Sequence, residues 1–375
     1  MAGQKQRDIQ AILKRHRKFW SLEQVDRPLL VVPVDIYAPT KRFCSTLVRD
    51  KLDPSDVDSA KVMEEYDRMV GVHEEIGDDY LVAAEPVLGV PWLEAMVGCP
   101  IHVSSTGAMA ARSVRDPQSI RTIAVSRENR WLQASLDFLK TATRHAAGRY
   151  PVCIGHLRGS TDILFAMMGS ESFFLSFYDQ PERIRTLAQM AANAWVEAAT
   201  SQLKVVPRFH DGYVLRWFGI WAPEPTVWYQ DDASTMISRD FYQDLFLSPA
   251  RSALVFPYSV FHLHSPSLHI VDSILEANPP NLRAFNINMD PTGISIDKAI
   301  PVLQRIQEHH KSLILSKDLY QNFTLEEYDE IIQGLSPQGL CVWLDGRSVE
   351  EAHEILALAN EHTAKSRTRI LRRGK

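Results

Sequence analysis

The chain has 375 residues, of which 45% are hydrophobic and 23% are charged. This balance is typical of a folded protein with a large core and excludes an intrinsically disordered chain. The formal net charge of −5 gives no electrostatic footprint for nucleic acid, and the basic segments at both ends are better explained as solvated faces.

The cysteines and the apolar runs restrict the compartment. Cys44, Cys99, Cys153 and Cys341 lie far apart and form no CxxC pair, which argues against a disulfide framework and fits a reducing environment. The basic start of the chain is not followed by an apolar segment, and no stretch is long and apolar enough to cross a bilayer. We therefore expect a cytoplasmic protein without membrane or nucleic-acid partners.

Eight short apolar runs, rich in β-branched residues, recur along the chain and are expected to be strands. They lie at Leu29–Val34, Tyr80–Ala84, Val152–Leu157, Tyr213–Phe218, Val260–His264, Leu282–Met289, Ser312–Leu315 and Leu340–Leu344. Longer segments with helical periodicity separate them, and several open on Ser, Thr or Asp with an acidic residue in the first turn. Strands that alternate with helices pair in parallel, because each helix returns the chain to the same edge of the sheet.

Eight such units predict an α/β fold, a single (β/α)8 TIM barrel. The alternative is an open doubly wound sheet, but no GxGxxG or GxxxxGK[ST] phosphate loop follows any strand. We expect an N-terminal basic helical extension over residues 1–26, one barrel domain over residues 27–362 and a basic tail over residues 363–375. A long insertion after the second strand, from Pro86 to Pro117, is expected to form a short extra sheet or a lid.

Polar residues stand at or after every expected strand. They are Asp35, Glu85, His156 and Arg158, Arg216 and Trp217, His262 and His264, Asn286, Asn288 and Asp290, Lys317 and Asp318, and Asp345. Each one alone is explained by a helix cap or a satisfied core group. Together they predict a polar site, because the carboxyl ends of parallel barrel strands meet at one face, and burying so many ionisable groups there costs stability unless they pair or bind a ligand.

Two histidines one residue apart, His262 and His264, end the fifth expected strand. Side chains at positions i and i+2 of a strand point to the same face, so the two imidazoles are expected side by side. Such a pair suits a metal site, a metal-free polar substrate site, or a structural place in the core.

The segment RWFGIWAPEPTVWYQDD concentrates aromatic residues, with Trp217, Trp221 and Trp228. We expect it to be a loop after the fourth strand, where its rings offer a platform for a flat ligand and a neighbouring carboxylate acts as general base. A hydrophobic lid that packs on its own barrel is the alternative.

Several segments carry a resemblance to a known family. In chain order they are RPLLVVPVDIY, YPVCIGHLRGSTDILFAMMGSESFFLSFYDQPERI, WAPEPTVWYQDDASTMISRDFYQDLFLSPARSAL, VFHLHSPSLHIVDSILEANPPNLRAFNINMD and GLCVWLDGRSVEEAHEILALAN, and they resemble parts of the uroporphyrinogen decarboxylase-like superfamily. The resemblance spans Arg27 to Asn360 and implies a (β/α)8 barrel with a cleft at the carboxyl ends of the strands. True uroporphyrinogen decarboxylases carry an R-Q-A-G-R motif at the first strand, which RPLLVVPVDIYAP lacks, so the chain is more similar to the zinc-dependent, corrinoid-dependent methyltransferases of the superfamily.

The resemblance also implies ligands and partners. In the methyltransferase branch, an H-x-C pattern after strand five and a Cys after strand eight bind zinc; here His262-Leu263-His264 takes the H-x-C place. We expect Asp345, at the end of the eighth strand, as the third ligand rather than Cys341 within it. Such ligands suit zinc but also iron, manganese or cobalt. The expected partners are a small-molecule substrate, a corrinoid protein and a second copy of the chain in a homodimer.

The favoured function is therefore a metal-assisted methyltransferase. Asp231, His156 and Asp318 are the candidate catalytic groups, and the candidate substrate-binding residues are Arg158, Trp217, Trp221, Lys317, Asp290 and Glu85. Two alternatives remain. One is a metal-free lyase or decarboxylase that clamps a carboxylated substrate with Arg158, Arg216 and Lys317, and the other is a non-catalytic ligand-binding barrel.

Overall fold

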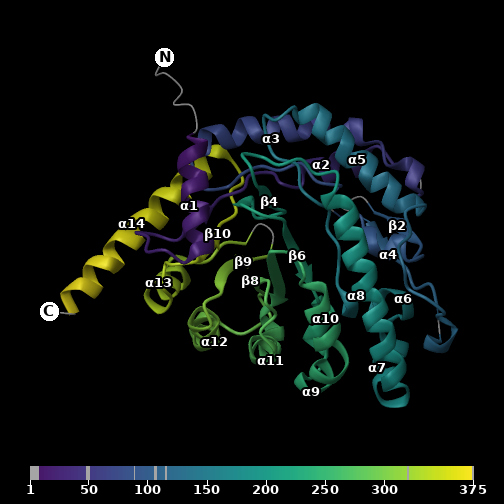
Figure 1. The fold of residues 1–375 in the computed structure, drawn as a ribbon. Coiled ribbons are helices and arrows are strands. Elements are labelled where there is room, and N and C mark those ends of the chain that lie inside the picture. The colour runs from purple at the N-terminus through teal and green to yellow at the C-terminus, as the bar shows by residue number, and fades with distance from the viewer. Residues whose placement is uncertain are drawn as a thin grey trace.

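The computed structural model describes residues 8–47, 51–87, 89–104, 108–114, 116–318 and 321–373. At its centre lies a sheet of six parallel strands in the spatial order β1, β10, β9, β8, β7, β6 (Figure 1). These strands span Leu29–Val31 (β1), Thr226–Gln230 (β6), Tyr258–His264 (β7), Leu282–Met289 (β8), Ser312–Lys317 (β9) and Leu340–Trp343 (β10). Two antiparallel pairs lie outside this sheet: β2 (Ile101–Val103) with β3 (Ala108–Ala110), and β4 (Tyr213–Leu215) with β5 (Ile220–Ala222).

The helices surround the sheet. Their bounds are Ile9–Ser21 (α1), Ala38–Ser45 (α2), Met63–Ile76 (α3), Trp92–Met96 (α4), Arg130–Ala146 (α5), Ser160–Met168 (α6), Ser170–Asp179 (α7), Pro181–Leu203 (α8), Arg239–Phe241 (α9), Leu247–Ala253 (α10), Val271–Ala277 (α11), Ile296–Glu308 (α12), Leu325–Gly334 (α13) and Val349–Arg373 (α14). Helices α5, α8, α10, α11, α12, α13, α14 and α3 contact one another in this order, and a short 3-10 turn at Ser59–Val62 links α3 back to α5. Figure 1 shows part of this ring as an arc around the strands, with α14 projecting at one side.

The closed barrel expected from the sequence is not confirmed, because the six-stranded sheet is open. Five expected strands appear in it as β1, β7, β8, β9 and β10, whereas the expected second and third strands, Tyr80–Ala84 and Val152–Leu157, share only an isolated parallel bridge between Ala84 and Val152. The coarser expectation, an α/β fold around a parallel sheet, is confirmed.

The expected fourth strand is also different. Tyr213–Leu215 forms β4 of a hairpin, because Trp217 and Gly219 adopt φ of 65° and 61° and turn the chain back onto β5. A Cβ on Gly219 would lie 2.5 Å from the Leu81 carbonyl oxygen, so a larger residue does not fit this turn. The strand that pairs with β7 at this edge of the parallel sheet is β6, which lies in the segment expected to be a loop.

A buried carboxylate replaces the missing ladder beside β1. Asp79 accepts a hydrogen bond from the Leu30 amide at 2.9 Å and an ion pair from Arg27 at 2.6 Å, and it also pairs with Arg15. The neighbouring Asp78 accepts from the Val32 amide at 2.7 Å. Burial opposes ionisation of Asp79, but Arg27 and Arg15 lower its pKa overall. Side chains thus satisfy edge amides that a pairing strand would otherwise bind.

A glycine makes the corresponding contact beside β6. The Gly159 amide donates to the Gln230 carbonyl at 2.7 Å, and a Cβ on Gly159 would lie 2.4 Å from that oxygen. The segment after the third expected strand therefore reaches the last residue of β6 without a continuous ladder.

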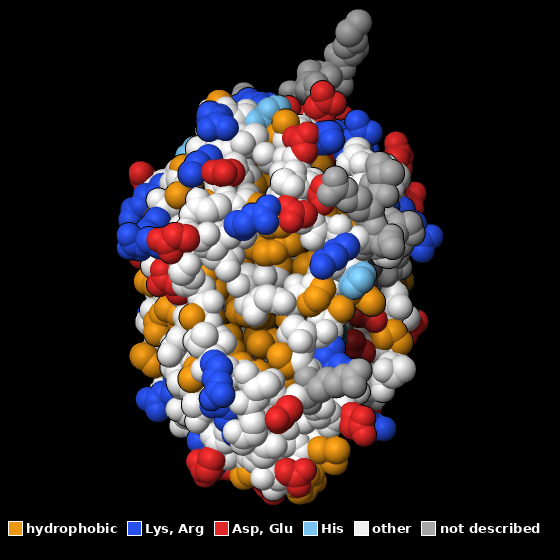
Figure 2. Space-filling view, turned by 90° about the vertical axis from the view of Figure 1, so that its right-hand side faces the viewer, with side chains coloured by type: hydrophobic (Ala, Val, Ile, Leu, Met, Phe, Trp, Pro, Cys, Tyr) orange, Lys and Arg blue, Asp and Glu red, His pale blue; other side chains and the backbone are white. Residues whose placement is uncertain are grey.

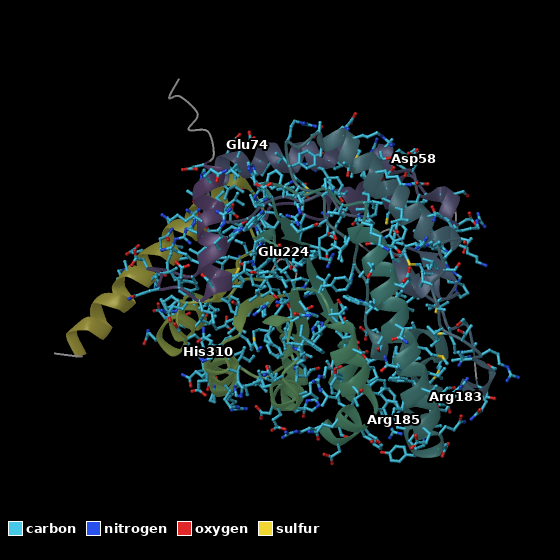
Figure 3. All side chains as sticks on the ribbon, in the orientation of Figure 1. Asp58, Glu74, Arg183, Arg185, Glu224 and His310 are labelled. Carbon is cyan, nitrogen blue, oxygen red and sulfur yellow. The ribbon has the colours of Figure 1, made fainter. Side chains whose placement is uncertain are left out.

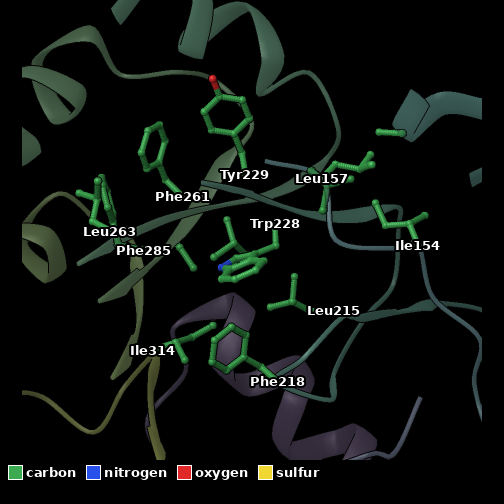
Figure 4. Close-up of a cluster of buried hydrophobic side chains, with 14 of the residues drawn as sticks. Ile154, Leu157, Leu215, Phe218, Trp228, Tyr229, Phe261, Leu263, Phe285 and Ile314 are labelled. Atoms are coloured by element: carbon green, nitrogen blue, oxygen red, sulfur yellow. The ribbon is translucent and has the colours of Figure 1, made fainter. Parts of the chain in front are cut away.

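The core is packed on both faces of the parallel strands, as expected for strands that helices cover on one side and other strands enclose on the other. Figure 4 shows Phe261 and Leu263 of β7 with Phe285 of β8 on one face of the strands, and Trp228 of β6 on the other face. A smaller cluster lies under α1 and consists of Ile12, Leu13, Leu81, Phe209, Val214 and Trp221.

The insertion after the second expected strand forms a short extra sheet, as anticipated, since it contains α4 and the β2–β3 pair. At the other end, α14 runs on to Arg373 and so passes residue 363, the expected start of the tail. Of residues 1–26, α1 occupies Ile9–Ser21, while residues 1–7 lie outside the described chain.

The surface carries charges of both signs. On the face drawn in Figure 2, basic and acidic side chains alternate around a central hollow in which hydrophobic side chains are visible. Within the described residues, no helix combines the length and apolarity that a membrane crossing requires.

Replacing Asp79 tests the role of this carboxylate at the sheet edge. Asp79→Asn keeps the size of the side chain but removes the charge that holds Arg15 and Arg27, so we expect the free energy of unfolding to fall by about 2–4 kcal/mol in urea denaturation. Asp244→Asn is the matched control, because Asp244 pairs with Arg185 on the surface (Figure 3) and should change stability by less than about 1 kcal/mol. Equal effects of the two variants would contradict the assigned role.

Candidate metal and substrate site

A cavity of about 500 Å³ lies at the carboxyl ends of β6, β7, β8 and β9. Its lining consists of Tyr37, Gly89, His156, Arg216, Trp217, Phe218, Trp228, Gln230, Asp232, His262, His264, Asn286, Asn288, Ser316, Lys317 and Asp318. Because these strands are parallel, their polar ends gather at one edge of the sheet, which is where α/β proteins place ligands.

His262 and His264 stand side by side, as the alternation along β7 predicts. Their ring centroids are 5.0 Å apart, and their Nε2 atoms lie 3.6 Å and 3.5 Å from the same oxygen, Oδ1 of Asp232. The ligand atoms of these three residues all lie within 4.8 Å of one another, so the group could hold a metal ion.

The opposite ring nitrogens are already engaged. Nδ1 of His262 donates to Oδ1 of Asn286, whose amide nitrogen in turn donates to the Ile314 carbonyl and the Ser316 hydroxyl. Nδ1 of His264 donates to Asp290 at 2.7 Å. These bonds place a proton on each Nδ1 and direct both Nε2 atoms at Asp232, which is the orientation that metal-binding histidines need.

Asp232 begins the 3-10 turn Asp232–Met236 directly after β6, and the last residue of β6 holds its side chain. Gln230 donates its side-chain amide to Oδ2 of Asp232, while Oδ1 is buried and makes no conventional hydrogen bond within the described chain. Gln230 also accepts a hydrogen bond from Nε2 of His156 at 2.5 Å. A relay thus runs from His156 through Gln230 to the carboxylate that faces the two histidines.

The charges in this group favour a cation. Burial lowers the pKa of His262 to about 4. Burial also opposes a charge on His264, but the attraction of the nearby carboxylates of Asp232 and Asp290 outweighs it and raises the pKa of His264 to about 10. The pKa of Asp232 falls to about 2, because the two histidines outweigh the opposing effect of burial. Two ionised carboxylates on either side of one imidazole form a field that suits an imidazolium or a divalent cation equally.

The geometry fits a zinc-like ion. Nitrogen and oxygen ligands at about 2.0–2.2 Å around a tetrahedral centre are separated by about 3.4 Å, close to the observed 3.5 Å and 3.6 Å. The buried Oδ1 of Asp232, which lacks a donor among the described residues, is a further sign that the group accommodates an ion.

The third ligand expected from the sequence, Asp345, is not in this group. Among the described residues, the candidate ligand groups are Asp232 with His262 and His264, and His264 with Asp290 and Asp318. Asp345 instead accepts a hydrogen bond from Nε1 of Trp343 at 2.9 Å and contacts Asn322 through its backbone. Cys341, the alternative, is fully buried inside β10.

The three candidate catalytic residues are in different environments. His156 lines the cavity and packs against Trp228, with ring centroids 5.2 Å apart. Asp318 also lines it and accepts a hydrogen bond from Asn288 at 2.7 Å. Asp231 points away from it and is enclosed by the hydroxyls of Thr161, Tyr229 and Tyr242, where burial raises its pKa to about 7. The alternation of β6 therefore presents Asp232, not Asp231, to the cavity.

The candidate substrate-binding cations already have partners. Lys317 binds Glu327 at 2.7 Å, Arg158 binds the buried Glu94, and Arg216 binds Glu85 at 2.7 Å. Glu327 is itself fixed by a capping box with Thr324 at the start of α13. A clamp of three unpaired cations, which the lyase alternative requires, is therefore not what the structure presents.

Of the other candidate substrate-binding residues, one lines the cavity, one lies away from it, and two hold neighbouring side chains in place. Trp217 lines the cavity and stacks on Trp343 at 5.6 Å with nearly parallel rings. Trp221 lies in the cluster under α1, where its Nε1 donates to the Phe209 carbonyl, so it is placed away from the site. Asp290 orients His264, and Glu85 holds Arg216.

A second cavity of about 440 Å³ adjoins the first. It is lined by β3 and α6, includes Arg158 and Asp162, and shares Gly89, His156, Gln230 and Asp232 with the main cavity. The insertion thus covers one flank of the site.

Sequence reasoning missed Asp232, Asn286 as an orienting group, and Gln230. The signal for Asp232 is present in WYQDD, because Trp228, Gln230 and Asp232 follow the period of two that puts side chains on one face of a strand. That period is recognisable only if the segment is treated as a strand, and the prolines before it favour a loop.

The fold and this site define a parallel-sheet α/β protein with a candidate histidine–carboxylate centre at the strand ends. No family model and no curated protein matches the chain. One similar solved structure is a methyltransferase from Methanosarcina mazei, with a TM-score of 0.62, 14% sequence identity, and coverage of 93% of this chain and 98% of that chain. At this identity the likeness shows a shared fold, and the resemblance to the uroporphyrinogen decarboxylase-like superfamily stays a prediction.

His156 provides a test of the buried environment. Burial, with Arg216 and Arg158 nearby, lowers the pKa of His156 well below its usual 6.5, so below about pH 6.5 the unfolded chain binds a proton that the folded chain does not. Stability must then fall as the pH falls. Between about pH 7.5 and 5.5, the loss of unfolding free energy should be smaller in His156→Gln than in the wild type by up to about 1.4 kcal/mol.

The control for this measurement is His310→Asn, which changes an exposed histidine at the periphery (Figure 3). His310 has φ of 54°, a conformation that Asn tolerates well. The control should keep the pH dependence of the wild type; an unchanged slope in His156→Gln as well would show that the folded state protonates His156 freely.

Proposed function

We propose that the chain is a metal-dependent enzyme that transfers a methyl group, with the metal held by Asp232, His262 and His264. The observation that carries the proposal is the convergence of both Nε2 atoms on one buried oxygen of Asp232. The shared fold with a methyltransferase supports the reaction class.

The residues around the proposed metal have distinct tasks. Asn286 and Asp290 hold the two imidazoles in orientation, and Gln230 holds Asp232. His156 lies at the far end of the same relay, and burial together with the neighbouring Arg216 and Arg158 lowers its pKa and keeps it neutral. Neutral His156 can therefore accept a proton from a substrate group that enters the cavity.

The metal, when bound, would act as a Lewis acid that activates the methyl acceptor or polarises the methylated group. Two neutral imidazoles and one carboxylate place less negative charge on the ion than thiolates would, which makes such a centre more electrophilic. We propose zinc as the ion. We also propose a corrinoid protein as the methyl carrier, on the basis of the resemblance to the uroporphyrinogen decarboxylase-like superfamily.

Metal analysis tests the centre directly. The purified protein should contain close to one equivalent of a divalent transition metal, and His264→Ala should lose it. Asn286→Ala, which removes only the partner of His262, should weaken metal affinity by about 10–100-fold.

His269→Ala is the matched control, because His269 lies on the same stretch of chain but bonds only to the Pro266 and Ile237 carbonyls. It should retain the metal. A protein that purifies without metal and binds none on titration would refute the centre.

Activity is tested with methylcobalamin as donor and a small thiol as acceptor, by following the absorbance change as the cobalamin loses its methyl group. Wild-type protein should accelerate this change, and His264→Ala should not. A metal-loaded protein that leaves methylcobalamin intact would remove the corrinoid from the proposal.

A further inference from the structure

Two hydrogen-bond donors on the wall of the main cavity lack an acceptor. Nη1 of Arg216 and Nε1 of Trp228 are buried and contact no acceptor within the part of the chain that the structure describes. Both residues line the cavity, and the Arg216 guanidinium lies over the Trp228 ring, 4.8 Å from its centroid. A buried donor without an acceptor is unfavourable, so this pair marks a place where an acceptor atom of a ligand would be stabilised.

The acceptor belongs next to the candidate metal. The Trp228 ring centroid lies 4.6 Å from that of His262 and 5.2 Å from that of His156. A ligand group at Trp228 is therefore in contact with the residues to which the proposed chemistry is assigned.

The local charges disfavour an anionic group. Glu85 binds Nε and Nη2 of Arg216 at 2.7 Å and 3.2 Å and so compensates its charge while leaving Nη1 available. Lys317 is compensated by Glu327 in the same way. The remaining charged groups of the wall are the carboxylates Asp232 and Asp318 and the His264 imidazole, which already lies between Asp232 and Asp290. A divalent ion or the imidazolium of His264 is held by these carboxylates, and an additional buried anion would have no partner.

The rest of the cavity suits a flat apolar body. Tyr37, Trp217, Phe218 and Trp228 contribute aromatic surface to its lining. The Trp217 ring is held by stacking on Trp343 and by an edge contact with Tyr37 at 5.4 Å. Rings that are fixed in this way present a preformed surface to a planar ligand.

We propose that the cavity binds a neutral, planar molecule whose oxygen, as in a carbonyl, amide or ether, accepts hydrogen bonds from Nη1 of Arg216 and Nε1 of Trp228. This inference rests on the proposed function in that it names the substrate class of the same site. It differs from the carboxylated substrate of the lyase alternative in the charge of the ligand.

Three probes of similar shape test the proposal: acetophenone, which is neutral with an acceptor oxygen; benzoate, which is anionic; and toluene, which has no acceptor. Their dissociation constants are measured by ligand-observed NMR on the full-length wild-type protein. Acetophenone should bind at least about fivefold more tightly than toluene and about tenfold more tightly than benzoate.

The variants remove one donor each. Trp228→Phe keeps an aromatic ring, and Arg216→Lys keeps a cation for Glu85; each should reduce the preference for acetophenone over toluene by about fivefold. Trp20→Phe is the matched control, because it removes an indole of α1 whose Nε1 donates to the Trp221 carbonyl and which does not line the cavity, and it should leave the preference unchanged. Using the ratio of two ligands cancels general losses of packing, and the thermal midpoint reports whether each variant is folded.

Benzoate that binds as tightly as acetophenone, no acetophenone binding at millimolar concentration, or a preference that survives both donor variants would overturn the proposal. The metal measurement stays separate. If the protein binds acetophenone but holds no metal, the neutral-ligand site stands and the metal-dependent methyltransferase proposal fails. If the protein holds the metal but does not bind acetophenone, the metal centre stands and the neutral-ligand proposal fails.

Discussion

The register of three neighbouring parallel strands determines where the two histidines of the site and the amide side chains beside them lie. Gln230 of β6 pairs with His262 of β7, which pairs with Asn286 of β8, and one step further along His264 pairs with Asn288. Because side chains alternate along a strand, a slip of one residue in β7 would move both imidazoles to the opposite face. The buried aliphatic and aromatic residues between them, such as Phe261 and Leu263, make such a slip costly, so core packing fixes the chemistry of the edge.

A second layer of carboxylates surrounds this edge and neutralises its cations. Glu85, Glu94 and Glu327 pair with Arg216, Arg158 and Lys317, and the three acids come from separate parts of the chain. Such pairs hold buried charges in fixed positions, although they add little to stability themselves. The residues that remain uncompensated are those around the two histidines, which concentrates the local negative field at one point of the cavity.

The sequence pattern predicts the strands from β7 onward correctly but not most of those before β7, for identifiable reasons. β7 and β8 are long, apolar and flanked by clear helix signals, so both strands and the pairing of His262 with His264 were predictable. β6 was hidden because Pro223 and Pro225 precede it and its aromatic residues suggested a loop. The hairpin at Tyr213–Ala222 was missed because its turn depends on positive φ at a tryptophan, Trp217, which no propensity anticipates.

The prediction of Asp345 as the third metal ligand required it to lie close to His262 and His264, and the sequence does not show which side chains are close in space. Asp345 does lie at the end of its strand, but the indole of Trp343 binds it, whereas Asp232 follows β6, a strand that the sequence pattern did not indicate. The open sheet has a similar cause. Its second and third segments are apolar enough to be strands, yet Asp78, Asp79 and Gly159 make the contacts to the sheet edges that backbone pairing would make.

Glu327 connects the start of helix α13 with the wall of the cavity. Its carboxylate accepts the Thr324 amide at the first turn of α13 and also neutralises Lys317 at the mouth of the cavity. The nucleation of a peripheral helix and the charge state of the entrance are therefore set by one side chain. A substitution of Glu327 would therefore both remove one half of the capping box of α13 and leave Lys317 without this carboxylate partner at the cavity.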